Sequence, residues 1–544
     1  MTNPEEDFTS RGWLVAAATL AVLIVVSFIP PIDAGEVRLR RASIISDLIT
    51  FSSDTELAEA QAEAAPEIDV EEFEVDLEQV ARTVAHTTAS ASPLGEATSA
   101  SWEGIFDEQP TGGNYTASKE PIATSFANLL PDTSLITPIE EFAGDEFNSP
   151  LSRLYDKLLR GEEPVRIAFM GDSFVEGDIL TADLRELLQD TFGGGGVGFV
   201  PFASPFTGFR QTIKTTAKGW TPYNIMQRKS VPAPYVSDFF VSGWVARAAN
   251  DATTRWEVSS KRRHLEECNR ARLIFIARQH TRIAIRLNDG EERIFEFEPD
   301  EVVRQIVVEE PSIRSLEMTV LEGEAGFTGI GADFDSTEDG VAVDNFSIRS
   351  NNGQAMFWSS ASVNAQVHSM RAYDLVILQY GLNIMQADRH NYSLYGEQVE
   401  KMIRYAESCF PGAVVMVMGV SDRSQRGEQG IVPMTSAVDL TAAQRQAAER
   451  CGVVFWNTYE AMQRLGGMTH FVEQGWAGKD YTHINYAGGR EIARSLYHAI
   501  LLGADQRSRT LRERVESSRP VLRERSLEIT TTQLDIDTLL TPKF

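Results

Sequence analysis

Cysteine is scarce in this sequence, with only three such residues among 544. They are Cys268, Cys409 and Cys451, an odd number without any C-x-x-C spacing. A disulfide framework needs paired cysteines, and a zinc ribbon needs closely spaced ones. The sequence therefore supports neither kind of stabilisation, and its cysteines do not indicate a cellular compartment.

Basic residues are also in short supply, because 50 Lys and Arg stand against 78 Asp and Glu, for a formal net charge of -28. Nucleic-acid affinity depends mainly on Lys and Arg that neutralise phosphates, so we exclude nucleic acid as a partner. The chain does have apolar material, with 42% hydrophobic residues. That content is enough for at least one large core, and it excludes global disorder.

One long apolar run follows a short segment of residues 1–12. Residues 13–29 carry no charged side chain, and at a rise of about 1.5 Å per residue they just span a hydrocarbon core of about 30 Å. We predict a single transmembrane helix there. A cleavable signal peptide is the alternative, but the run is long for one, and Ile32-Asp33-Ala34 is a poor cleavage site.

Acidic residues gather after this run. Residues 54–78 contain eleven Asp and Glu and no Lys or Arg, and the sequence stays rich in Ser, Thr, Ala and Pro to about residue 137. Such a segment repels itself and lacks apolar area to offset its ordering entropy, so we predict a disordered tether over 30–137. The alternative is a solvated acidic helix packed on the next domain. Residues 503–544 form a charged C-terminal tail.

The region between tether and tail has the pattern of an α/β domain. Residues 165–170 form an apolar run that ends at Gly171, and leucines then recur at helical spacing over 180–188. Alternating strands and helices predict a doubly wound parallel sheet, which we place in residues 138–207 and 342–502. Its later segments are the strands 374–379, 413–420 and 453–456 and the helices 393–409 and 440–451.

The pattern changes between residues 208 and 341. Residues 282–287 and 293–297 flank Asn288-Asp289-Gly290, which is a hairpin signal, and further β-rich runs follow without a long helical pattern. We predict an all-β sandwich domain over 208–341, inserted into the α/β domain after its first strand and helix. Insertion at an exposed loop costs little, because loop-closure entropy grows slowly with length.

A candidate nucleophile follows the first predicted strand, in Gly171-Asp172-Ser173-Phe174. A serine at a strand-to-helix turn projects its hydroxyl above the carboxyl end of the sheet. Its N–H would lie at the helix N-terminus, where developing negative charge is favoured. The alternative is an ordinary helix N-cap.

A serine nucleophile needs a base, and His483 is the best placed of the eight histidines. It stands three residues after Asp480, just before a segment with one apolar helical face. The Asp480 carboxylate can accept the Nδ1–H and fix the tautomer, so that Nε2 faces the serine. The alternative is an Asp–His pair that caps the helix.

Two further residues are candidate donors to an oxyanion. Asn383 follows strand 374–379, where its side-chain N–H can reach the same crevice. Gly353 follows Asn351 and Asn352, and its missing Cβ lets the N–H approach a substrate closely. A competing glycine cluster at 193–198 is interpreted as a loop beside the cleft.

Together these motifs resemble the four sequence blocks of the SGNH (GDSL-type) hydrolases, and they occur in family order. Two departures, Phe174 for the usual Leu and Ile384 for a frequent Asp, remove no catalytic atom. The resembling segments are Gly171-Asp172-Ser173 for block I, Gly353 for block II, Gly381-x-Asn383 for block III and Asp480-x-x-His483 for block V.

The resemblance implies a role for each matching residue, and it implies neither a metal nor an organic cofactor. Ser173 is the implied nucleophile, His483 the base and Asp480 the residue that orients it. The implied oxyanion donors are the N–H groups of Ser173 and Gly353 and the side chain of Asn383.

A β domain between blocks I and II is similar to the arrangement in bacterial peptidoglycan O-acetylesterases, where the insert resembles a carbohydrate-binding module. This implies a serine esterase that removes O-acyl groups, above all O-acetyl, from a cell-envelope polysaccharide such as peptidoglycan. The alternatives are a polysaccharide O-acyltransferase with the same triad and a non-catalytic glycan-binding protein. Aromatics of the insert could stack on sugars, but each is interpreted as core; they are Trp220, Tyr223, Tyr235 and Trp244.

An envelope substrate implies a single-pass protein of the bacterial inner membrane, with the catalytic domain on the periplasmic side. The charges argue the other way, since Arg38, Arg40 and Arg41 follow the predicted span and only Arg11 precedes it. A large C-terminal domain can translocate despite such a bias, so we keep the periplasmic orientation as the expectation.

Overall fold

The structure is a computed structural model that describes residues 32–34, 37–39, 74–90, 125–144, 147–205, 210–266, 268–336, 339–427 and 430–539. It divides into two units, Met1–Ala65 and Pro66–Phe544. In the first unit the described part is an antiparallel pair of strands, β1 (Ile32–Ala34) and β2 (Val37–Leu39). The helices of the described ranges include none suited to crossing a membrane, and the predicted span 13–29 lies outside these ranges.

The second unit is built on a six-stranded sheet with the order β14-β4-β15-β16-β19-β3. Five strands are parallel and the edge strand β3 is antiparallel, which confirms the predicted α/β class. The central strands β15 and β16 are buried throughout, as expected for a sheet covered on both faces. The strands are β3 (Ile139–Glu141), β4 (Val165–Gly171), β14 (Val341–Ser347), β15 (Leu375–Gln379), β16 (Val414–Met418) and β19 (Val454–Trp456).

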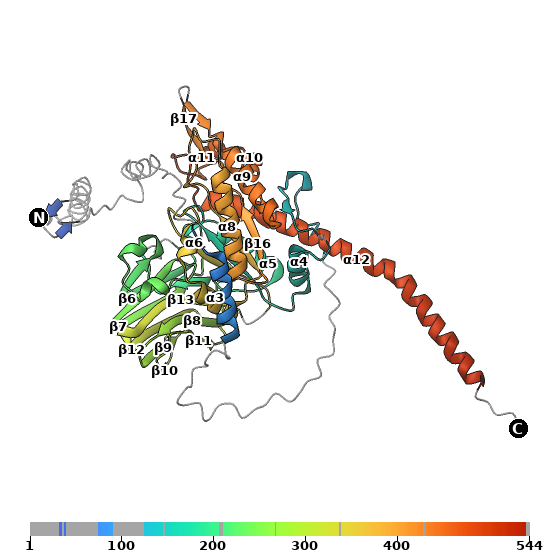
Figure 1. The fold of residues 1–544 in the computed structure, drawn as a ribbon, viewed down its shortest axis with the longest axis horizontal. Coiled ribbons are helices and arrows are strands. Elements are labelled where there is room, and N and C mark those ends of the chain that lie inside the picture. Colours follow the sequence, from blue (N-terminus) through green and yellow to red (C-terminus); the bar gives the residue numbers. More distant parts are fainter. Residues whose placement is uncertain are drawn as a thin grey trace, which may run out of the picture. The chain divides into compact units, whose positions relative to one another are not determined.

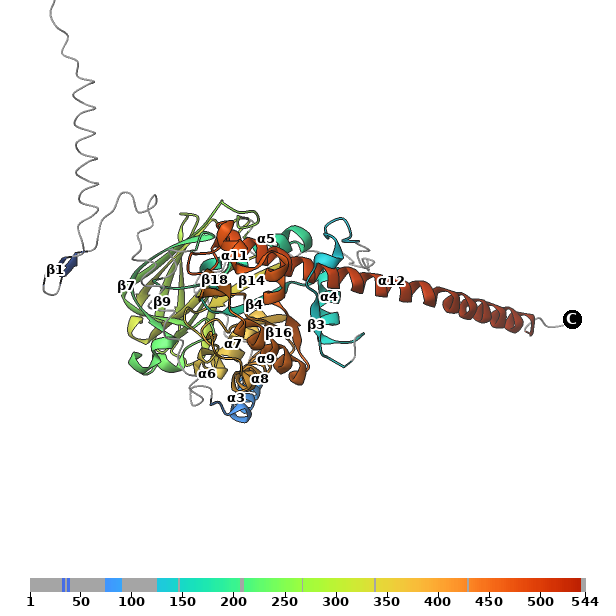
Figure 2. The same cartoon turned by 90° about the horizontal axis from the view of Figure 1, so that it is seen from above.

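Helices cover both faces of this sheet (Figures 1 and 2). On one face α4 (Pro150–Arg160) and α5 (Thr181–Phe192) pack against the start of α12 (Tyr486–Leu539). The other face is covered by α7 (Ala361–Arg371), α8 (Ser393–Cys409) and α9 (Ser436–Cys451). Shorter helices are α6 (Ala355–Trp358), α10 (Thr458–Arg464) and α11 (Gly467–Glu473).

Helix α3 (Leu77–Ser90) corrects part of the predicted 30–137 tether. Its apolar residues recur at helical spacing, and Val84 is buried against the domain core. Thr87 also donates a hydrogen bond to the hydroxyl of Ser362 on α7, at 3.2 Å. A packed helix therefore describes these residues, because one apolar face outweighs the acidic composition. Residues 30–31, 35–36, 40–73 and 91–124 of the predicted tether lie outside the described ranges.

The β-rich region forms one nine-stranded antiparallel sheet that folds over on itself as a sandwich. Strand β13 pairs with both β7 and β8 and so joins the two halves, which enclose a second core around Trp256, Phe275 and Phe327. The sheet also takes in β5 (Gly198–Pro201), which precedes residue 208 and pairs with β13. The other strands are β6 (Ile213–Asn224), β7 (Trp244–Val258), β8 (Arg270–Ala277), β9 (Thr281–Leu287), β10 (Glu292–Phe297), β11 (Val303–Glu309), β12 (Ser315–Glu322) and β13 (Phe327–Asp335).

A buried ionic cluster attaches the sandwich to the α/β domain. Arg371, at the end of α7, donates hydrogen bonds to Asp333 and Asp335 of β13 and, at 2.7 Å, to Asp344 of β14. Tyr373 also donates to Asp344, at 2.7 Å. Charged groups this deeply buried are costly unless they are paired, so the cluster holds the two domains in a defined relation.

Candidate active site

Ser173 lies in the turn after β4, at the carboxyl edge of the sheet. A Cβ on Gly171 would come within 2.9 Å of Val175 and 3.2 Å of Gln379, so only glycine fits this turn. The Asp172 carboxylate accepts the Phe174 N–H at 2.9 Å. Ser173 is partly exposed, and neither its hydroxyl nor its N–H forms a hydrogen bond within the described ranges. Both groups are therefore available to a substrate.

The helix after this turn begins later than predicted. Helix α5 begins at Thr181, and residues 172–180 form a loop with a short 3₁₀ turn at Glu176–Asp178. The loop is held by the buried carboxylate of Asp178, which accepts hydrogen bonds from Arg210 at 2.9 Å and Thr212 at 2.6 Å. The predicted placement of Ser173 at a helix N-terminus is therefore wrong.

His483 and Asp480 form the predicted pair. The distance from His483 Nδ1 to Asp480 Oδ2 is 2.6 Å, and the other carboxylate oxygen accepts the backbone N–H groups of Thr482 and His483 at 3.1 and 3.2 Å. Burial raises the pKa of Asp480, but the hydrogen bond and charge of His483 outweigh it, so this pKa lies below its ordinary value. The imidazole itself is half exposed.

A hydrogen bond connects this histidine loop to the serine turn. Tyr486, at the start of α12, donates a hydrogen bond to the Gly177 carbonyl at 3.0 Å. The charge of His483 also acts on the Asp172 carboxylate. No hydrogen bond joins Ser173 to His483 in the described part of the chain, and such bonds are often long in enzymes without substrate. The serine and its candidate base thus lie on adjoining loops.

The Asn383 side chain connects its own loop after β15 to the serine turn and to the loop that carries Gly353. Its side-chain amide donates to Asp172 Oδ2 at 3.1 Å and to the Asn351 carbonyl at 3.0 Å. One side chain from the loop after β15 therefore ties the serine turn to the loop after β14. Both amide hydrogens are engaged, so one of these bonds must give way before Asn383 can donate to an oxyanion.

Gly353 has a backbone that favours glycine, with φ at +106°, and a Cβ would lie 2.0 Å from the Met402 sulfur. Its N–H donates to Asn351 Oδ1 at 2.9 Å. Gly353 is therefore required by packing, while its N–H must leave Asn351 to meet a substrate. The oxyanion roles of Gly353, Asn383 and the Ser173 N–H stay predictions.

The competing glycine cluster lies at the other end of the sheet. Gly194 packs on Val341 and Gly198 on Val343, close to the start of β14, whereas Ser347 at the end of β14 is level with Gly171. Because these glycines lack a Cβ, the chain can pass close to the backbones of β13 and β14. The interpretation of 193–198 as a loop beside the cleft is therefore wrong.

Asp172 is the part of the site that sequence reasoning missed, because it was considered only as a helix cap. The residue is fully buried, and this burial raises its pKa to about 7, although the Phe174 N–H, His483 and Asn383 oppose the rise. No sequence signal indicates this, since Asn383 is 211 residues away.

We predict that Asp172→Asn gains stability relative to the wild type as the pH rises. The folded-state pKa of Asp172 is raised from 3.8 to about 7. Below about pH 3 the carboxyl is neutral in both states, and above pH 7 the buried charge destabilises the folded state by at most about 4 kcal/mol. Urea unfolding at pH 4.5 and pH 8 measures the difference. A difference that is independent of pH would contradict the assignment.

The aromatic side chains of the inserted β domain lie mainly in its core. Tyr235 and Trp244 are buried, and Trp220 packs on Phe202 and Phe327, with ring centroids 5.3 and 5.8 Å away.

The described residues contain no group of three or more His, Cys, Asp or Glu side chains arranged to hold a metal ion.

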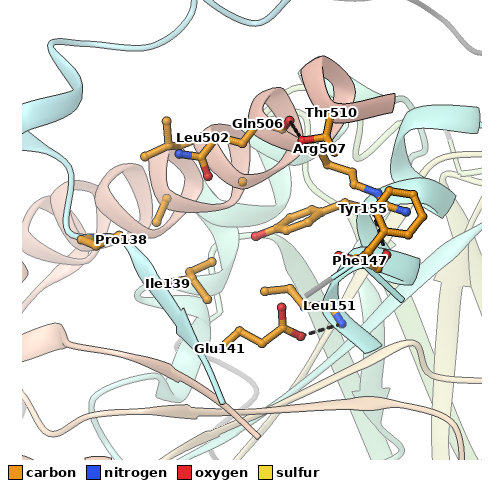
Figure 3. A pocket seen from close by; sticks show the side chains of 13 residues that line it. Pro138, Ile139, Glu141, Phe147, Leu151, Tyr155, Leu502, Gln506, Arg507 and Thr510 are labelled. Atoms are coloured by element: carbon orange, nitrogen blue, oxygen red, sulfur yellow. Dashed lines mark hydrogen bonds between the residues drawn. The ribbon is translucent and has the colours of Figure 1, made fainter. Parts of the chain in front are cut away.

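A cavity of about 380 Å³ lies between β3, α4 and α12 (Figure 3). Its wall includes Ile139, Leu151 and Tyr155, with Gln506 and Arg507 from α12. Strand β3 is four strands away from β4 in the sheet. This cavity is therefore separate from the site around Ser173.

Comparison with known proteins identifies a solved structure of similar fold. The amino-acid sequence matches no protein-family model and no curated protein. A solved structure described as a peptidoglycan O-acetylesterase is 21% identical, with a TM-score of 0.53, and the match covers 70% of this chain and 99% of that one.

Two further structures match with scores too low to carry an argument. A lipase/acylhydrolase from Enterococcus faecalis has a TM-score of 0.23 at 18% identity and covers 30% of this chain and 77% of its own. A family two carbohydrate esterase from Clostridium thermocellum has a TM-score of 0.22 at 9% identity, covering 47% and 93%. With the geometry above, the peptidoglycan O-acetylesterase match shows the fold: this chain is similar in fold to that esterase over most of its length.

Proposed function

We propose that the protein is a serine esterase that removes O-acyl groups, above all O-acetyl, from a cell-envelope polysaccharide such as peptidoglycan. The observation that carries the proposal is the meeting of the Ser173 turn, the Asp480–His483 pair and Asn383 at one edge of the sheet. The fold match to a peptidoglycan O-acetylesterase supports the same substrate class.

The reaction follows from the positions of these groups. The Ser173 hydroxyl attacks the ester carbonyl while His483 Nε2 takes its proton. Asp480 holds the imidazole through Nδ1, and the Ser173 N–H faces the oxyanion. The intermediate collapses, His483 protonates the departing sugar oxygen to give the sugar hydroxyl, and an acyl-enzyme remains on Ser173. Water then attacks the acyl carbonyl while His483 takes its proton, and His483 returns this proton to the Ser173 oxygen as the carboxylic acid leaves.

The rest of the chain fits a polymeric substrate. The β sandwich is held to the catalytic domain by the buried Arg371 cluster, so a glycan bound along it would keep a fixed relation to Ser173. We also propose membrane anchoring through residues 13–29, with the catalytic domain on the periplasmic side. A reporter fused after Phe544 that is active only in the periplasm tests this orientation, and activity only in the cytoplasm would contradict it.

Acetate release from O-acetylated peptidoglycan tests the activity. The purified protein should release free acetate in proportion to the loss of glycan acetyl groups, with or without an acceptor sugar. Release from neither peptidoglycan nor other acetylated envelope glycans would contradict the proposal. An acetylated acceptor with little free acetate would contradict hydrolysis and identify an acyltransferase.

A further inference from the structure

Arg423 lies in the loop after β16, which contacts the loop that carries Asn383 and the loop that carries His483. The loop after β16 runs from Gly419 into the hairpin of β17 (Ser424–Gly427) and β18 (Gly430–Pro433). The Ser424 N–H donates to the Tyr481 carbonyl at 3.1 Å, beside Asp480. The Arg423 guanidinium reaches the Met385 carbonyl, two residues after Asn383, at 3.5 Å. Arg423 therefore lies next to both motifs of the proposed site.

The Arg423 guanidinium forms fewer hydrogen bonds than a largely buried guanidinium needs. A guanidinium offers five N–H donors. The residue is only partly exposed, and among the described residues its one side-chain hydrogen bond is long and its buried Nε has no partner. It forms no ion pair with any described carboxylate within 4.0 Å. A buried donor without a partner costs about 1–3 kcal/mol, and a charged one costs more.

The described groups of the protein do not supply the missing acceptor. The charge of Asp480 acts on Arg423, but no ion pair within 4.0 Å joins the two residues, and Asp480 pairs with His483 instead. Other buried arginines do have carboxylate partners, since Arg185 and Arg371 each form an ion pair with a buried aspartate. In addition, the hydroxyls of Ser421 and Ser424 in the same loop are buried without a partner. The loop therefore has unused hydrogen-bonding groups beside the reacting centre.

We propose that Arg423 binds a carboxylate of the substrate glycan, close to the ester that Ser173 attacks. This inference rests on the esterase function proposed above and narrows the substrate to an acidic sugar, such as a uronic acid or a sugar with a lactyl ether. A carboxylate matches the planar guanidinium with two parallel hydrogen bonds. A chain with a net charge of -28 also needs a local cation to hold an anionic polymer.

A matched pair of polymers tests the proposal. One is an O-acetylated polysaccharide with a carboxyl group in its repeat, and the other is its carboxyl-reduced, re-acetylated counterpart. The measured quantity is the ratio of kcat/KM for the acidic polymer to that for the neutral one. Arg423→Gln should lower this ratio about 10- to 100-fold, mainly through KM for the acidic polymer, and Arg423→Lys should restore part of it.

The control is Arg404→Gln, because Arg404 lies on the surface of α8 and pairs with Glu407 at 2.7 Å. The kcat/KM ratio of Arg404→Gln should equal that of the wild type. A ratio unchanged in Arg423→Gln, or an equal loss of kcat on both polymers, would overturn the subsite. Wild-type release of acetate from neither polymer would instead overturn the esterase function.

Discussion

Ser173→Ala should lower kcat/KM for ester hydrolysis by at least about 10⁴-fold, to the level left by binding and oxyanion donors alone. The substitution removes only the hydroxyl, whose oxygen carries the acyl group in the proposed mechanism. Since this hydroxyl has no hydrogen bond among the described residues, its loss leaves no buried partner unsatisfied. The variant should therefore unfold within about 0.5 kcal/mol of the wild type.

The matched control for this variant is Ser408→Ala. Ser408 lies on the exposed side of α8, where its hydroxyl donates only to the Arg404 carbonyl of the same helix, at 2.8 Å. Its replacement should leave acetate release unchanged. Steady-state kinetics with a chromogenic acetate ester and with acetylated glycan measure both variants. Turnover in Ser173→Ala above about one per cent of the wild type would remove Ser173 from the mechanism.

His483→Ala has the second largest expected effect, a loss of about 10⁴-fold in kcat, because the serine then has no base and the leaving sugar has no acid. Asp480→Asn should cost somewhat less, since the imidazole remains but its tautomer is no longer fixed by the 2.6 Å contact to Nδ1. In both variants the residual rate should rise with pH, as hydroxide replaces the missing base.

His264→Ala is the control for the histidine. His264 also contacts a carboxylate, at 2.8 Å from Asp190, but it lies beside Gly196 at the opposite end of the sheet. Its kcat should stay within about twofold of the wild type. A pH–rate profile across pH 5–9 separates the two histidines. An equal loss in His264→Ala and His483→Ala would indicate that the effect comes from folding.

Sequence reasoning located the parts of the site that depend on local spacing. Asp480 and His483 are three residues apart on one loop, so their hydrogen bond needs no knowledge of the tertiary fold. The predicted parallel sheet brings the loops after neighbouring strands to the same edge, which is where Asn383 meets Asp172 in the turn that carries Ser173. The β9–β10 hairpin was also predictable, because Asn288 and Asp289 tolerate the positive φ values of 50° and 59° found there.

The features it missed depend on contacts between distant residues. Asp172 is buried because Asn383 and Phe174 close around it, and Arg423 lies near Asp480 across 57 residues of sequence. Helix α3 was concealed by its acidic neighbours, although Val84 supplies an apolar contact. The start of α5 shifted because Asp178 is held by Arg210 and Thr212 from beyond the first helix.

Labelling with a serine-directed fluorophosphonate probe, followed by peptide mapping, tests the central claim most directly. The probe requires an activated serine nucleophile but no knowledge of the natural glycan. We predict one phosphonyl group per chain, attached to Ser173, absent in Ser173→Ala and strongly slowed in His483→Ala. A wild-type protein that stays unlabelled, or that carries the label on another serine, would contradict the account.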